Sequence, residues 1–398
     1  MSSGPPSEPD RFEAVDWERV TAAESEHLGR NVRAFLAGLG LLAAGFLYDA
    51  GGNSLPLVAA LEPLDWLLAV SLVAVGSFVA VPLARNPGMT RRYWKRLRSH
   101  PLGVASLAYI LLFAAVGLVG PLFVTEPTRW VLSRSYQPPV GLSVDTRWLL
   151  GSCVGPVVDG RCQGTWRFPL GTTHLGKDML PFVVLGARTS LQVALVSATI
   201  IVPTGVGVGL VAAYAGGRTD AVLMRVAEVL QTVPAIFVYL LFWQWNREYR
   251  LLAMIAVFGM ASWGGLARLV RNEVLQRRES LFVKAAWTAG ADGRQVMRWH
   301  LLPNISGPVL TNVTLQIPLL IVTEAALSFI IFRPHERTLG DPTVVSWGQT
   351  IFYGVRVADV HPGWWITAIP GVLLVLTVLS FNLFGRALSD VLDPRREH

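Results

Sequence analysis

The chain alternates between long apolar blocks and polar loops. Eight blocks of roughly 20 residues carry almost no charge, which is the length that a helix needs to cross the ~30 Å hydrocarbon core of a bilayer. Each block is continuously apolar, whereas the strands of a transmembrane β-barrel are alternating segments of ~10 residues. We therefore predict an all-α polytopic membrane protein, with spans at 32–48, 66–83, 103–124, 191–213, 226–243, 251–270, 305–331 and 364–384.

Composition agrees with this prediction. The 398 residues are 52% hydrophobic and 15% charged, against about 25% charged in soluble domains, so a soluble enzyme is excluded. The net charge of +7 comes from basic residues beside the apolar blocks, as membrane topology requires, and we expect no binding to nucleic acid. The seven histidines are scattered and show no metal-ligand spacing, so no metal site is expected.

The distribution of basic residues predicts the orientation. The loop 49–65 contains no Lys or Arg, whereas 85–98 contains six and 268–298 contains seven. Cytoplasmic loops are enriched in these residues, so both basic loops are expected in the cytoplasm of a plasma-membrane protein. With eight spans both termini are cytoplasmic, and the loops 125–189 and 333–363 lie outside. The start of the chain is acidic and polar, unlike a secretory signal.

Internal symmetry offers no support for a transporter that works alone. Pro203, Pro234 and Pro318 are expected to interrupt helices. A secondary transporter built from inverted repeats would show broken helices in corresponding positions of its two halves. These three prolines cannot be paired in that way, although an ion-gradient-driven secondary transporter stays the alternative.

The cytoplasmic loop 271–304 holds the most informative segment. Ser280 is placed to cap a short helix over 281–289, and Gly290 to end it, because Ser is favoured just before a helix and Gly just after one. Asp292, followed three residues later by a glutamine, has the spacing of a capping box for the next helix.

The short helix over 281–289 is apolar on nearly every side, with Leu281, Phe282, Val283 and Trp287 among its residues. A cytoplasmic helix of this kind needs a surface against which it is buried. It either packs on its own membrane domain or docks into another protein, and its residues alone favour neither.

The same loop carries the spacing of a known signature. Lys284-Ala285-Ala286 is followed by three residues and Gly290, and then by nine residues, His300 and Leu301-Leu302-Pro303. This resembles the EAA loop of ABC-importer permeases, where Glu-Ala-Ala, Gly, Ile and Leu-Pro stand at these spacings. Lys284 replaces the usual Glu and reverses its charge, and His300 replaces the usual Ile.

The resemblance extends in order over about residues 91 to 395. It is to dipeptide and oligopeptide permeases, and within them to the second of the two permease subunits. The segments that carry it are 170–178, 186–191, 215–217 with Asp220, 224–225, 267–271 with Glu273, Glu324, 327–329, 346–348, 381–383 and 392–394. The resemblance predicts a six-helix core over 91–398. A polar acidic tail, 1–31, and an extra two-helix region, 32–90, precede it.

The resemblance also implies partners. In such importers a second permease completes the pore, two cytoplasmic ATPases hold ATP and Mg²⁺, and an external binding protein delivers the solute. The chain is then a membrane-embedded transport subunit rather than an enzyme, binds no cofactor, and helps to move di- or oligopeptides or a similar small solute. The residues expected to couple it to an ATPase are Leu281, Phe282, Val283, Lys284, Ala285, Ala286, Gly290, Asp292, Leu302 and Pro303, where Pro303 starts the next membrane helix.

One segment imitates a nucleotide-binding loop. Gly171, Gly176 and Lys177 have the spacing of a P-loop. Asp178 stands where a Ser or Thr would bind Mg²⁺, its charge would repel phosphate, and the segment is predicted outside. We therefore expect no ATP binding there.

Two acids and two cysteines are further candidates. Ionisable residues in a membrane helix are paired or face a cavity, so Glu324 and Glu228 are candidates for the translocation path. The alternatives are an interhelical hydrogen bond for Glu324, and an ion pair or an exposed position for Glu228. Cys153 and Cys162, the only cysteines, fall in the outer loop, where oxidation is allowed. They form either a disulfide or two free thiols.

Overall fold

The computed structural model describes residues 17–51, 62–125, 131–245, 249–331, 345–358 and 363–392. The predicted tail up to residue 16 and the motif residues 393–394 lie outside this part of the chain. Within it, seven helices are long and apolar enough to cross a membrane. The prediction of an all-α polytopic membrane protein is confirmed.

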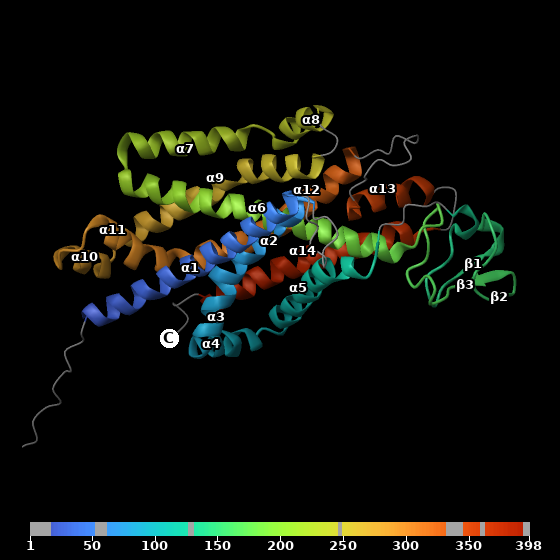
Figure 1. The fold of residues 1–398 in the computed structure, drawn as a ribbon, viewed down its shortest axis with the longest axis horizontal. Coiled ribbons are helices and arrows are strands. Elements are labelled where there is room, and N and C mark those ends of the chain that lie inside the picture. Colours follow the sequence, from blue (N-terminus) through green and yellow to red (C-terminus); the bar gives the residue numbers. More distant parts are fainter. Residues whose placement is uncertain are drawn as a thin grey trace, which may run out of the picture.

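These helices run roughly along the long axis of the molecule (Figure 1). Several extend beyond the apolar blocks, because polar caps set their ends. The Asp178 carboxylate, for example, accepts the Leu180 N–H at 3.0 Å and starts its helix well before residue 191. The helices are α1 (Trp17–Ala50), α2 (Pro63–Val75), which continues through the π-helical turn Gly76–Ala80 into α3 (Val81–Arg85), α5 (Pro101–Val119), α6 (Met179–Ala215), α9 (Arg250–Arg278), α12 (Leu302–Ile331) and α14 (Trp365–Leu392).

The predicted span 226–243 is a bent pair of helices. α7 (Gly217–Thr232) and α8 (Ala235–Trp245) meet at 68°. Pro234 in the break has no N–H to donate, and Val233 before it is extended, with φ −74° and ψ 118°, as a residue before proline prefers. Eight spans are therefore present only if this pair is one span.

Pro203 and Pro318 do not interrupt their helices, which corrects the prediction. They lie inside α6 and α12, and both helices continue through them. A helix packed in a membrane bundle tolerates an internal proline because neighbouring groups satisfy the freed backbone carbonyl. Of the three prolines, only Pro234 separates two helices.

The core is built around the pair α6 and α9, which pack closely along their length. A Cβ at Gly209 of α6 would stand 2.6 Å from the Ala267 carbonyl of α9, so only glycine permits this approach. The buried cluster beside this pair contains Leu266 and Val270 and continues to Val296 in the loop 271–304. The loop and the membrane core therefore share one packed interior.

The N-terminal helices pack on this core. α1 lies against α2, and α2 lies against α6. Leu68 of α2 joins a buried cluster formed mainly by α6, α8, α9 and α12. Asp65, near the start of α2, forms an ion pair with Arg188 of α6 and accepts a hydrogen bond from Gln192 Nε2 at 2.9 Å. The extra region is thus fixed to the core by packing and by a partly buried ion pair.

Several elements lie in segments that the sequence analysis assigned to loops. α4 (Pro87–Arg98) connects α3 to α5, and α13 (Trp347–Ala358), within the predicted outer loop, packs on α12 and α14. Both are shorter than a membrane span and carry polar residues, so an apolar-block criterion does not find them. The described part of the chain also contains 3₁₀ turns at Gly120–Leu122, Leu132–Arg134 and Thr146–Trp148.

Two further loop structures lie at opposite ends of the molecule (Figure 1). At one end β1 (Ser143–Asp145), β2 (Val157–Val158) and β3 (Arg161–Gln163) form an antiparallel sheet in the order β1-β3-β2. At the other end lie α10 (Leu281–Thr288) and α11 (Gly293–Gln295), and the π-helical segment Val296–Leu301 links α11 to α12.

Candidate functional site

α10 is anchored to the core mainly by one side chain and exposes most of the others. Val283 is fully buried in the cluster that includes Val274 of α9. Leu281 is 84% exposed, and Phe282 and Trp287 are nearly half exposed. Most of the apolar surface of α10 is therefore left uncovered by the part of the chain that the structure describes.

Gly290 ends α10 as predicted. Its φ of +88° lies in the left-handed region, which glycine adopts at little cost. Its N–H donates to the Trp287 carbonyl at 3.0 Å, and the Ala291 N–H donates to the Ala286 carbonyl at 3.0 Å. Together these bonds form a Schellman motif. The motif fixes the direction in which the chain leaves the helix.

The caps on either side of α10 follow the prediction in part. Ser280 precedes the helix, but its hydroxyl donates to the Arg277 carbonyl at 2.5 Å instead of capping α10. Asp292 and Gln295 form the predicted capping box. The Gln295 N–H donates to Asp292 Oδ1 at 2.6 Å, and the Asp292 N–H donates to Gln295 Oε1 at 3.0 Å. α11 therefore starts at a defined position directly after α10.

The helix that enters the membrane begins before Pro303, which corrects the predicted start. The π-helical segment Val296–Leu301 continues α11 into α12, and the Leu302 N–H donates to the Met297 carbonyl, five residues back. Pro303 then lies in the first turn of α12. The wider turn lets the chain pass the proline ring without a break. α11 and α12 therefore form one continuous rod.

The rest of the loop connects α10 to the membrane helices. A Cβ at Gly293 would stand 2.7 Å from the ring of Tyr214, near the end of α6. Ala286 is half-buried, whereas Lys284 and Ala285 are exposed. In the described ranges no acidic side chain pairs with Lys284. The EAA-like residues thus divide into a packed part and a part that faces outward.

A polar groove lies between α7 and α9. Its volume is about 500 Å³, and Asp220 and Glu228 of α7 line it opposite Arg268 and Arg271 of α9. The Arg271 guanidinium donates to both Asp220 carboxylate oxygens, at 2.5 Å each. Glu228 pairs with exposed Arg225 at 3.2 Å. Asp220 and Arg271 both lie in motif segments of the sequence, but the sequence does not predict them as a pair, because 51 positions separate them.

Glu324 lies apart from this groove, in the interior of the bundle. It is 1% exposed, and its carboxylate accepts hydrogen bonds from Ser328 at 2.8 Å, Ser346 at 2.5 Å and Ser190 at 3.3 Å. These three hydroxyls come from α12, from the residue before α13 and from α6. Glu324 therefore links three segments through hydrogen bonds, in agreement with the alternative of an interhelical hydrogen bond, and its place in the translocation path stays a prediction.

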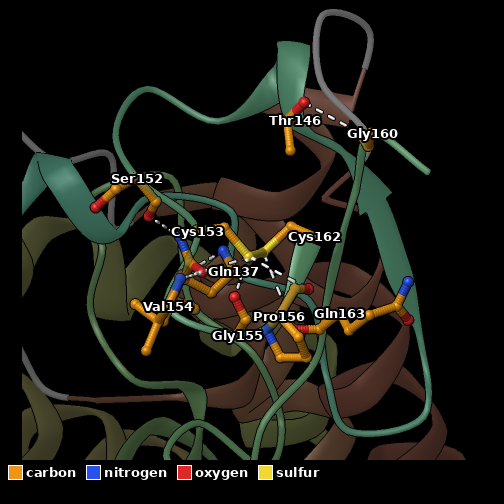
Figure 2. Close-up of a disulfide and its surroundings, with 11 residues drawn as sticks. Gln137, Thr146, Ser152, Cys153, Val154, Gly155, Pro156, Gly160, Cys162 and Gln163 are labelled. Atoms are coloured by element: carbon orange, nitrogen blue, oxygen red, sulfur yellow. Dashed lines mark hydrogen bonds between the residues drawn. A yellow bond between two sulfur atoms is a disulfide. The ribbon is translucent and has the colours of Figure 1, made fainter. Parts of the chain in front are cut away.

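The structure joins Cys153 and Cys162 in a disulfide, with their Cα atoms 5.6 Å apart. Figure 2 shows Gln137 directly beside it. Gln137 is 3% exposed, its Oε1 accepts the Val154 N–H at 2.9 Å, and its Nε2 donates to the Ser152 carbonyl at 3.2 Å. Its side chain therefore holds the loop that the disulfide closes, a role that no sequence pattern indicated.

Two family models match the chain. The model of the binding-protein-dependent transport system inner membrane component matches residues 205–398, which include the groove and the loop around α10. The model of the N-terminal TM domain of oligopeptide transport permease C matches residues 88–139. The N-terminal helix pair thus precedes both matched regions.

Curated relatives match most of the chain. The oligopeptide transport system permease protein OppC of Haemophilus influenzae is 31% identical over 305 residues, which cover 77% of this chain and 87% of the relative. The dipeptide transport system permease protein DppC of Bacillus subtilis is 32% identical over 309 residues, 77% and 86% of the two chains. OppC of Escherichia coli K12 is 30% identical over 302 residues, 76% and 89%. The chain therefore belongs to the inner-membrane permeases of binding-protein-dependent ABC transport systems, the family of the oligopeptide and dipeptide permeases.

Proposed function

We propose that the chain is the second permease subunit of an ABC importer and moves di- or oligopeptides, or a similar small solute, across the plasma membrane. The names of the relatives support the solute class. The observation that carries the proposal is α10. This helix exposes Leu281, Phe282 and Trp287 at one end of the molecule and is anchored by Val283.

In this proposal α10 docks into a cytoplasmic ATPase. An apolar helix in water needs a covering surface, and a groove on the ATPase would supply it. The Schellman motif at Gly290 and the capping box at Asp292 hold α10 and α11 at a fixed angle. A displacement of α10 would therefore pass through Val283 to α9 and through Gly293 to Tyr214 of α6.

The remaining partners follow from this arrangement. The seven basic residues between 268 and 298 favour a cytoplasmic loop, and with it two cytoplasmic termini. ATP and Mg²⁺ would then bind to two ATPase subunits, and this chain would hold no cofactor. The disulfide-closed sheet at the other end would face an external binding protein. A second permease would complete the pore beside the membrane helices of this chain.

The test is recovery of the ATPases with the purified chain. Leu281→Glu places a charge on the exposed start of α10 and leaves Val283 in place. We therefore expect the amount of recovered ATPase to fall about tenfold or more, which corresponds to a loss of at least ~1.4 kcal/mol of binding free energy. Leu150→Glu is the matched control, because Leu150 is 61% exposed in the external loop, and it should leave recovery unchanged.

Two results would contradict the proposal. One is full recovery of the ATPases with the Leu281 variant. The other is solute uptake by the chain alone, driven by an ion gradient without nucleotide, which is the behaviour of a secondary transporter.

A further inference from the structure

α4 is the most strongly basic element of the chain. Residues 66–125 contain no acidic residue, and all six of their basic residues fall between 85 and 98. α4 directly follows α3 and is followed by α5, so a membrane helix adjoins it at each end. A helix of 12 residues is about 18 Å long. It is therefore too short to cross a bilayer, and its neighbours hold it close to the membrane surface.

One face of α4 is fixed to the rest of the protein. Leu97 is 8% exposed and packs with Ala387 and Val391 of α14. Arg96 Nη1 donates to the Val391 carbonyl at 3.3 Å. α4 therefore packs in a fixed orientation against the last turns of α14, and this orientation determines which of its residues point away from α14.

The opposite face is basic and contains a tryptophan. Arg91, Lys95 and Arg98 lie on it at helical spacing with Arg92 beside them, and all four are exposed. Trp94 is 39% exposed, and the Arg98 guanidinium lies 5.1 Å from its ring centre. No acidic side chain in the described ranges pairs with any of the four basic residues. Within the part of the chain that the structure describes, four positive charges therefore lie uncompensated around an amphipathic aromatic ring.

We propose that this face of α4, formed by Arg91, Arg92, Trp94, Lys95 and Arg98, is a binding site for the headgroups of anionic phospholipids in the cytoplasmic leaflet. Basic clusters next to a membrane helix attract anionic lipids, and a tryptophan ring is stable at the level of the headgroups. The inference rests on the proposed orientation of the chain, which places α4 on the cytoplasmic side.

The position of α4 favours lipid over a protein partner. Figure 1 shows α4 nearer to the middle of the long axis than α10, which lies at the end of the molecule. An ATPase that covers α10 would therefore lie beyond α4 along this axis, whereas the surface of the bilayer would lie next to α4. Bound headgroups would fix the C-terminal end of α14 through Leu97 and Arg96.

The test is lipid retention by the purified full chain, measured by native mass spectrometry during titration with phosphatidylglycerol or phosphatidylcholine. We expect phosphatidylglycerol to bind more tightly. Arg91→Gln with Lys95→Gln removes two charges from one face, so its affinity for phosphatidylglycerol should fall roughly tenfold to thirtyfold. Arg91→Lys with Lys95→Arg keeps both charges and should retain the wild-type preference.

The matched control removes two exposed charges from the external end, Arg147→Gln with Arg167→Gln. It should change the affinity less than about twofold, because Arg147 is already paired with Asp145 at 2.8 Å. Equal phosphatidylglycerol affinity in the wild type and the Arg91/Lys95 glutamine variant would overturn the proposal. So would retention of inorganic phosphate or ATP at the same residues with no preference between the two lipids. ATPase recovery with the glutamine variant should be unchanged, so a failure here is distinguishable from failure of the proposed coupling.

Discussion

Replacement of Glu324 distinguishes a structural tie from a residue of the translocation path. Glu324→Ala removes the acceptor of three buried hydroxyls, from Ser190, Ser328 and Ser346. Ser190 and Ser328 lie in helices, so their hydroxyls can turn to the carbonyl four residues back. Ser346 precedes α13 and is not part of a helix, so its buried hydroxyl, which donates to Glu324, loses this acceptor.

The magnitude follows from these partners. One unsatisfied buried hydroxyl costs about 1–3 kcal/mol, and the cavity left by the truncated side chain adds about 1–2 kcal/mol. We therefore expect Glu324→Ala to destabilise the protein by about 2–4 kcal/mol. Glu324→Gln keeps an acceptor oxygen and the volume, so its cost should be about 1 kcal/mol or less.

The assay is thermal unfolding of the purified chain in detergent, together with ATP-dependent uptake by the reconstituted complex. The alanine variant should unfold several degrees lower and lose uptake in proportion, whereas the glutamine variant should resemble the wild type in both. Thr323→Ala is the matched control, because this neighbouring side chain is only half-buried and its hydroxyl donates to the Leu319 carbonyl of its own helix. A glutamine variant with normal thermal stability and abolished uptake would refute the reasoning, because the charge itself would then be required.

Three further predictions concern other parts of the molecule. Gly290→Val should strain a left-handed backbone position by about 1–2 kcal/mol. It should uncouple ATP hydrolysis from uptake while the membrane domain stays folded. A normal ratio of solute transported to ATP hydrolysed would contradict this prediction. Asp65→Asn should weaken the interaction of α2 with Arg188 by about 1–3 kcal/mol, so protease cleavage between residues 52 and 61 should accelerate. Glu62 is exposed at the same helix start, and Glu62→Gln should leave the cleavage rate unchanged. Reduction of the bond between Cys153 and Cys162, which are nine positions apart, should destabilise the sheet of β1, β2 and β3 by about 2–3 kcal/mol. Amide exchange should then rise in this sheet and stay unchanged in α14. Unchanged exchange in the sheet would show that Gln137 alone is enough to hold the loop.

The sequence predicts the membrane helices because their signal is local. An apolar run of sufficient length is itself the physical cause of a span, so the blocks at 103–124 and 251–270 reappear as α5 and α9. The helix end at Gly290 and the capping box at Asp292 are equally local and were predicted from adjacent residues. Whether a proline breaks its helix is harder to predict from sequence, because the effect of Pro203 depends on the neighbouring helices that pack around it.

Long-range pairs have no local signal. The ion pair of Asp65 with Arg188 joins residues 123 positions apart, and Ser190 lies 134 positions from Glu324. The neighbours of each residue along the chain give no sign of its partner, because only the fold brings the two together. The exposure of Leu281 is likewise a property of the fold, since it depends on how α10 packs behind Val283.

The most direct test of the central claim is a photo-crosslinking residue in place of Leu281 in the assembled transporter. Leu281 is 84% exposed at the end of α10, so its side chain should lie within the ATPase surface that covers the helix. Irradiation should produce a covalent adduct of this chain with an ATPase subunit, and the same residue in place of Leu150 should not. An adduct with lipid alone, or no adduct with the ATPase, would contradict the account of α10 as the element that couples the ATPase to transport.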